Sequence, residues 1–191
     1  MIYGDTILKV LADRGDIRNT YEGAINPASI NLRLGDTFKR ISRAQPTVKL
    51  GEEVIYEDVI PYDGYVAIQP GEFMLATTIE WIHVPICAAA FVQGRSSIGR
   101  ASLTVQNAGF VDPGFEGHIT LELKNDGPIP IILYPGYPVT QLVYMEADDV
   151  SEPYRGKYFG QVHATESRMC EDIYKPGNQK EVSVDDKRSK K

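Results

Sequence analysis

The sequence predicts an all-β protein that begins with one short helix. After Pro27, short runs rich in β-branched and aromatic residues follow one another closely. Turn signals separate these runs, among them Asp63-Gly64, Pro70-Gly71 and Pro135-Gly136. Many short strands joined by glycine and proline turns favour a sandwich, a jelly roll or a barrel.

The first element is predicted as a helix that begins near Asp5 and stops at Gly15. Asp5 is the expected N-terminal cap, and Gly15 suits the left-handed residue that often follows a helix. The spacing of the apolar residues gives the helix one buried face, made of Ile7, Leu8, Val10 and Leu11.

The strands are predicted from alternation and from β-rich composition. Residues 30–41 alternate apolar and polar side chains over a long run. Shorter candidate strands follow at residues 54–60, 65–69, 73–84, 88–93, 118–125, 129–134 and 138–145.

The length of 191 residues suits one domain with a sizeable core and is too short for two large ones. We therefore predict a single domain over residues 1–169. Within it, residues 153–168 are polar yet carry three aromatic side chains, which suits a lid that closes over a ligand. Residues 170–191 are polar and mixed in charge, and we predict a flexible tail there.

Composition excludes several classes of partner. The formal charge of −6 argues against general nucleic-acid binding, so any anion site must be a local cluster of Arg and Lys. No apolar run approaches the ~20 residues that span a bilayer, so no membrane partner is expected. The N-terminus lacks the layout of a signal peptide, and two cysteines make no disulfide framework, which together predict a cytoplasmic protein.

Zinc is not expected. The two cysteines and three histidines do not occur at the spacings of a zinc site. The two short motifs of the zinc-dependent deaminases, H-x-E and P-C-x-x-C, are also absent from the sequence.

The most informative stretch is residues 94–125, which gathers a compact set of polar side chains. Guanidinium and hydroxyl groups suit a polyphosphate, whereas isolated carboxylates suit a sugar hydroxyl and an activated water. Each also has a plainer interpretation, as a surface loop, a turn or a solvated sheet face. The set comprises Arg95, Ser96, Ser97, Arg100, Asp112 and Glu122.

Glu122 lies in a run with strict alternation. Ile119, Leu121 and Leu123 fall on one face of the predicted strand, and Glu122 falls on the other. Glu122 is therefore a candidate general base if the fold forms a cleft on that face.

In order along the chain, these pieces resemble the dCTP deaminase branch of the dUTPase-like superfamily. The resemblance is carried by PASINLRLGDTF, FVQGRSSIGR, NAGFVDPGFEGHITLELKN, YPGYPVTQLVY and PYRGKYFGQ. It implies a distorted jelly roll of the dUTPase-like, or β-clip, kind. It also implies a homotrimer whose sites lie between subunits.

The resemblance implies roles for the site residues. Glu122 is the general acid and base, Arg100 and Ser96 orient the attacking water, and the carbonyl of Ala108 holds it. Asp112 takes the deoxyribose 3′-hydroxyl. The triphosphate, with its Mg²⁺, contacts Arg95, Ser97, Gln141, Tyr154, Lys157 and Gln161. The remaining substrate contacts implied are Ile98, Gly99, Thr120 and Leu121.

The resemblance further implies the reaction. The expected function is hydrolytic deamination of dCTP at cytosine C4, followed by cleavage of dUTP to dUMP and pyrophosphate, which supplies dUMP for thymidylate synthesis. Gly109 and Phe110 match the members that catalyse both steps. Whether dTTP inhibits the protein is left open. The alternatives are a plain dUTP diphosphatase and a catalytically silent nucleotide-binding jelly roll.

Two positions depart from the pattern of that family. Asn31 stands where an Asp is usual, close to the expected phosphate contacts. His163 stands in the lid motif where a Gly is usual, and a left-handed backbone there would suit Gly better than His.

Overall fold

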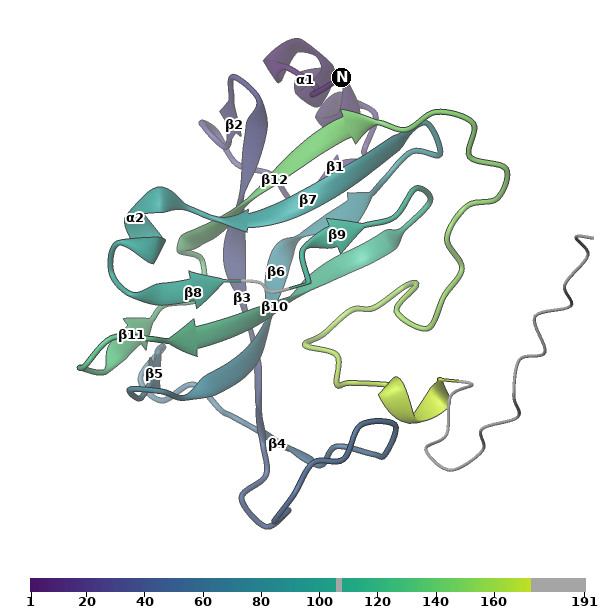
Figure 1. Cartoon of the computed structure of the whole chain (residues 1–191). Helices are drawn as coiled ribbons and strands as arrows, with labels where there is room; N and C mark the ends of the chain where they lie inside the picture. The colour runs from purple at the N-terminus through teal and green to yellow at the C-terminus, as the bar shows by residue number, and fades with distance from the viewer. Residues whose placement is uncertain (106–107, 173–191) are drawn as a thin grey trace, which may run out of the picture.

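The computed structural model describes residues 1–105 and 108–172, and the chain forms a strongly curled, mainly antiparallel β-structure. Ten strands make one sheet in which the main order is β8-β10-β6-β3-β12-β7-β9. Figure 1 shows the long β3 running through the molecule, with α1 at one end and β4 at the other. The all-β prediction, with one N-terminal helix and a jelly-roll arrangement, is confirmed.

The sheet has two halves that share β3, Ser29–Ile41. The first residues of β3 pair with β12, Pro138–Glu146, which in turn pairs with β7, Ala88–Gly94. The later residues of β3 pair with β6, Phe73–His83, and with β4, Tyr56–Asp58. A strand that passes from one half to the other is what curls the sheet around its core.

Gly35 stands where β3 changes partners. A Cβ built at this position would lie 2.6 Å from Thr77 Cγ2 of β6, and the pairing of β3 with β6 shifts register between Leu34 and Phe38. Glycine is therefore needed for close approach of the two backbones at the bend.

The remaining strands are short, apart from β10, Glu116–Asn125, which pairs with β6 and β8. They are β1, Ile17–Arg18; β2, Ile25–Asn26; β8, Leu103–Val105; and β9, Phe110–Val111. A separate pair joins β5, Val66–Ile68, to β11, Ile131–Leu133. Sequence alternation did not predict β1, β2, β8 or β9, because strands of two or three residues are too short to show a period.

The helix α1 spans Asp5–Asp13, but its cap differs from the prediction. Gly4 is the N-cap, and Asp5 is the first helical residue, where its carboxylate accepts a hydrogen bond from Lys9 Nζ at 2.7 Å. Of the four predicted apolar contacts, only Leu8 and Leu11 are buried, whereas Ile7 and Val10 are exposed.

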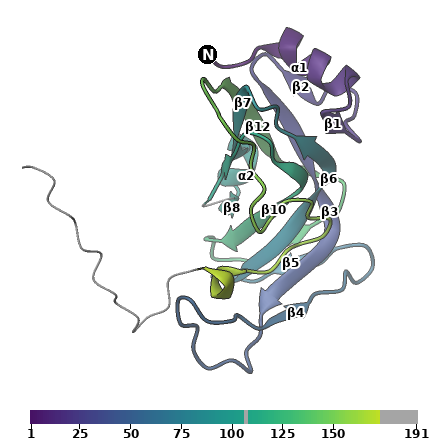
Figure 2. The ribbon, with the colours of Figure 1, turned by 90° about the vertical axis from the view of Figure 1, so that its right-hand side faces the viewer.

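After β12 the chain leaves the sheet and descends along the face that carries β10, as Figure 2 shows. It ends among the described residues in a short 3-10 helix, η1, Met169–Glu171. Residues 173–191, most of the predicted tail, lie outside the described residues. A second short helix, α2, spans Ser96–Gly99 after β7. No helix in the described part of the chain is long and apolar enough to cross a membrane.

Candidate active site

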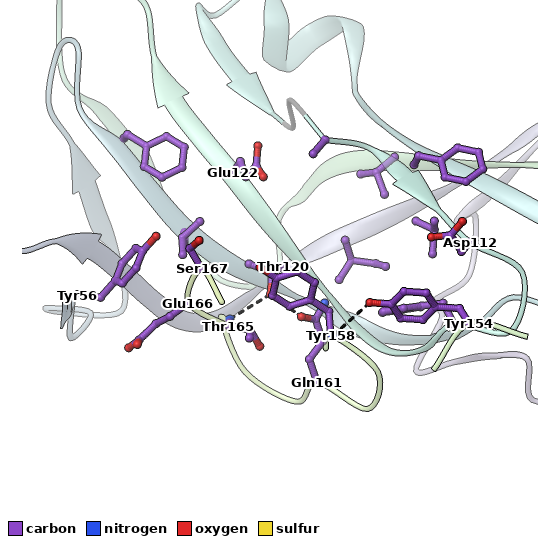
Figure 3. Close-up of a pocket in the computed structure, with 18 residues that line it drawn as sticks. Tyr56, Asp112, Thr120, Glu122, Tyr154, Tyr158, Gln161, Thr165, Glu166 and Ser167 are labelled. Atoms are coloured by element: carbon purple, nitrogen blue, oxygen red, sulfur yellow. Dashed lines mark hydrogen bonds between the residues drawn. The ribbon is translucent and has the colours of Figure 1, made fainter. Parts of the chain in front are cut away.

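A cavity of about 430 Å³ lies between β9, β10 and the C-terminal segment (Figure 3). Seven of the predicted site residues line it: Ala108, Phe110, Asp112, Thr120, Glu122, Tyr154 and Gln161. Polar and aromatic residues that the sequence analysis did not single out complete the wall: Tyr56, Phe73, Tyr158, Thr165, Glu166 and Ser167. The volume falls within the usual range for small-molecule sites.

Strand β10 brings Thr120 and Glu122 to the cavity. Their neighbours Leu121 and Leu123 are fully buried in the core, as the alternation predicted. Both polar residues are only partly exposed, because the C-terminal segment covers this face of the sheet. The Glu122 carboxylate is thus held on a rigid strand inside a concave site, which suits a general base.

Asp112 lies at the opposite end of the cavity from Tyr56 (Figure 3). It follows β9 directly and begins a turn in which Gly114 has a φ of +86°. The segment predicted as a lid, residues 153–168, starts against this turn, because the Tyr154 amide donates to the carbonyl of Pro113 at 2.7 Å. A Cβ at Gly114 would lie 2.3 Å from Pro153, so the close contact of turn and lid requires glycine.

The segment predicted as a lid is docked on β10 through Gln161. Its side-chain amide donates to the His118 carbonyl at 2.7 Å, and its side-chain oxygen accepts from Thr120 Oγ1 at 3.3 Å. The backbones also pair, because the His118 amide donates to the Gln161 carbonyl at 2.9 Å. Gln161 therefore lines the cavity and is itself held by two residues of one strand.

Gly160 provides the left-handed residue of the lid, with a φ of +76°. His163 does not adopt a positive φ, so the expected conflict at this position does not arise. Asn31, the other departure, is 8% exposed and lies opposite Gln141 in the pairing of β3 with β12.

Within residues 1–105 and 108–172, the charged residues that line the cavity are all acidic: Asp112, Glu122 and Glu166. Tyr56 lies near the Glu122 end, and burial raises the pKa of its phenol above the ordinary value, with a smaller opposing influence from the Ser167 backbone. The phenol is therefore neutral at physiological pH. A polyphosphate on this cavity would need cationic groups from outside its lining.

The arginine and serine loop, residues 95–100, lies apart from the cavity. Ser96, Ser97, Gly99 and Arg100 are exposed on α2 or directly after it, and none of them lines the cavity. Arg95 is partly buried and donates from Nη1 to the Pro138 carbonyl at 2.8 Å.

Ile98 points instead toward a second, apolar hollow of about 260 Å³. Its other walls come from β8, β11 and the chain before β12, including Leu103, Ile131, Leu133 and Tyr137. The predicted anion loop and the predicted base thus occupy different parts of one chain.

Four other predicted residues also lie outside the lining. Gln141 is on β12, where its side-chain oxygen accepts from Ser29 Oγ at 3.4 Å. The Gly109 carbonyl accepts from the Val92 amide at 2.8 Å, and Leu121 belongs to the core. Lys157 Nζ lies 2.6 Å from Asp172 Oδ1, and this hydrogen bond raises the pKa of Lys157.

No group of three or more His, Cys, Asp and Glu side chains with the geometry of a metal site occurs within residues 1–105 and 108–172. The three acidic groups of the cavity come from β10, from the turn after β9 and from the C-terminal segment.

A concave cavity lined by three carboxylates, set in a curled jelly roll, is typical of an enzyme that acts on a small molecule. A family model described as dCTP deaminase-like matches residues 1–147. The chain belongs to this family.

Two relatives illustrate the similarity. A protein of Sulfurihydrogenibium sp. (strain YO3AOP1), named dCTP deaminase, dUMP-forming, is 41% identical over 176 residues, 88% of this chain and 97% of the relative. A protein of Hydrogenobaculum sp. (strain Y04AAS1) with the same name is 48% identical over 155 residues, which cover 81% and 86% of the two chains.

A solved structure shares the fold. The 2′-deoxycytidine 5′-triphosphate deaminase from Agrobacterium tumefaciens superposes with a TM-score of 0.61 at 19% sequence identity. The match covers 76% of this chain and 48% of that one, so this chain spans about half the length of that protein.

Proposed function

We propose that the chain hydrolyses dCTP at cytosine C4 and then cleaves the dUTP formed to dUMP and pyrophosphate. The observation that carries the proposal is Glu122, held on β10 inside a concave cavity with Asp112 toward its other end. The names of the relatives support the same pair of reactions.

In the first reaction, Glu122 accepts a proton from a water that attacks C4. It delivers this proton to N3 of the ring. It then takes the proton of the new C4 hydroxyl and delivers it to the exocyclic nitrogen, which departs as ammonia and leaves a carbonyl at C4. Asp112 accepts a hydrogen bond from the deoxyribose 3′-hydroxyl and so orients the base toward Glu122. In the second reaction a further water attacks the α-phosphate, and pyrophosphate leaves.

We propose that the functional unit is a homotrimer. No basic residue of the described part of the chain lines the cavity, whereas Ser96, Ser97 and Arg100 are exposed elsewhere on the same chain. A neighbouring subunit that inserts this loop would supply the guanidinium and hydroxyl groups that a triphosphate needs. The apolar hollow beside Ile98 supports a contact there, because exposed apolar surface often marks an interface.

We propose that Mg²⁺ arrives with the triphosphate and that zinc has no part in the reaction. Shielding of the phosphate charges is the chemistry that Mg²⁺ supplies when bound. The proposed location is the cytoplasm, and the exposed free thiols of Cys87 and Cys170 support it.

The direct test is to incubate the protein with dCTP and Mg²⁺ and to separate dUTP, dUMP and dCMP. The proposal expects dUMP, pyrophosphate and ammonia. Release of dUTP alone, under single-turnover conditions with saturating Mg²⁺, would leave a simple deaminase. Turnover of dUTP without turnover of dCTP would identify a plain dUTP diphosphatase, and turnover of neither would favour the silent nucleotide-binding protein.

A further inference from the structure

Residues 164–167 lie over β6 and bond alternately to the strands on its two sides. The Ala164 amide donates to Thr37 Oγ1 of β3 at 3.0 Å. The next amide, that of Thr165, donates to Thr120 Oγ1 of β10 at 3.1 Å. Successive groups of an extended segment point in opposite directions, so the segment bridges β3 and β10.

Lys39 is the charged residue of β3 that holds the next residue of this segment. Its Nζ lies 3.0 Å from Glu166 Oε1 and 2.7 Å from Asp58 Oδ1 of β4. Lys39 is paired with Leu75 of β6, which is paired with Glu122 of β10. The three side chains therefore share one face of the sheet, with the backbones of Lys39 and Glu122 about 10 Å apart, two strand spacings.

The environment keeps Lys39 charged. Its side chain is 21% exposed, and hydrogen bonds to Asp58 and Glu166 raise its pKa although burial acts in the opposite direction. Partial burial also strengthens the ion pair with Glu166 relative to one in open solvent.

The bridged segment forms part of the cavity wall. Thr165, Glu166 and Ser167 line the cavity, with Thr165 beside Thr120 and with Ser167 near Tyr56 (Figure 3). Without this segment, the face that carries Thr120 and Glu122 would open to water. Exclusion of water strengthens every polar interaction within a site.

We propose that Lys39 is a positioning residue of the active site, which acts through Glu166 to hold residues 164–167 as the wall beside Glu122. Lys39 itself does not line the cavity. That the enclosed ligand is dCTP rests on the proposed function, whereas the positioning of the segment does not.

The test compares Lys39→Met and Glu166→Gln with the wild-type protein. Each variant should speed hydrogen exchange at the amides of residues 164 and 165 about two- to fivefold, the range that a partly exposed ion pair supports. For Lys39→Met, the Kd of dCTP should rise by the same range, and kcat should change by less than about twofold, because neither Glu122 nor any other residue of the cavity lining is altered.

Two further variants separate this role from a general loss of structure. Asp58→Asn removes the other carboxylate from the same lysine and should leave exchange and binding unchanged. Lys39→Arg keeps the cation and should preserve both the wild-type rate of hydrogen exchange and the wild-type Kd of dCTP. Unchanged hydrogen exchange in both Lys39→Met and Glu166→Gln overturns the inference. An equal effect of Asp58→Asn also overturns it, because Lys39 would then act through its ion pair with Asp58 of β4. If the wild-type protein binds no dCTP, but the two variants exchange faster at residues 164 and 165 as expected, the proposed function is overturned and the positioning role of Lys39 is supported.

Discussion

Glu122 is the residue on which the proposed chemistry depends. Changing it to Gln keeps the size and the hydrogen-bonding capacity of the side chain but removes the base. We expect kcat for deamination to fall by about 10²–10⁴-fold, as is usual when a general acid–base group is lost. The measurement is steady-state release of ammonia from dCTP.

The matched control is Glu116→Gln on the same strand. Glu116 lies outside the cavity lining, opposite His83 in the pairing of β10 with β6. This variant should turn over dCTP at the wild-type rate. Near-normal turnover by Glu122→Gln would remove Glu122 from the mechanism, provided that the variant still binds dCTP.

Gly109 governs the second reaction in the proposed scheme. It has no side chain and stands next to Ala108, which lines the cavity. A larger residue there should obstruct the water that attacks the α-phosphate or fix the backbone beside it. Gly109→His should therefore shift the product from dUMP toward dUTP while deamination continues. Chromatography of the nucleotides formed from dCTP measures this ratio, and an unchanged ratio would argue against a role for Gly109.

Among the elements, β3 and β6 are joined by an ion pair between the partly buried Arg33 and the fully buried Glu80. Glu80 is fully buried, and its carboxylate accepts from Arg33 Nε and from the Arg33 amide, both at 2.7 Å. Arg33→Met would leave this carboxylate buried without its cation. We expect the free energy of unfolding to fall by about 3–5 kcal/mol, the usual loss when one partner of a buried pair is removed.

Urea denaturation measures this change. Lys9→Met is the control, since it removes the ion pair between Lys9 and Asp5 on the surface of α1 and should leave the unfolding midpoint nearly unchanged. Equal destabilisation by the two variants would show that Glu80 gains little from Arg33.

At the scale of elements, periodicity predicted the long strands well and the cavity poorly. The alternation of residues 118–125 predicted correctly that Glu122 leaves the core on the face opposite Leu121. The contributions of Tyr56 and Glu166 were not predicted, because each lies in a short or irregular segment. Tyr56 reaches this face because β4 pairs with the later residues of β3, beside β6 and β10, and Glu166 reaches it through its ion pair with Lys39 of β3.

At the scale of the whole molecule, the arginine and serine loop lies apart from the cavity of its own chain, so another subunit would have to bring it to the site. If neighbouring subunits share each site, two inactive proteins should complement one another. Mixing equal amounts of Glu122→Gln and Arg100→Met, after dissociation and reassembly, should restore about a quarter of the wild-type activity, since a quarter of the shared sites then carry both native residues.

Light scattering provides the companion measurement and should report about three times the chain mass. If the variants regain no activity together while each remains trimeric, Glu122 and Arg100 do not come from different subunits. A fully active monomer would contradict shared sites altogether.

The wall at residues 164–167 also bears on how the protein is made. In chain order it follows every strand of the sheet, from β1 to β12. During synthesis the sheet can therefore assemble before residues 164–167 emerge, and the cavity wall is completed only after the sheet exists. A protease that cuts between β12 and this wall would leave a folded protein whose spectrum is nearly native but whose catalytic pocket is unfinished.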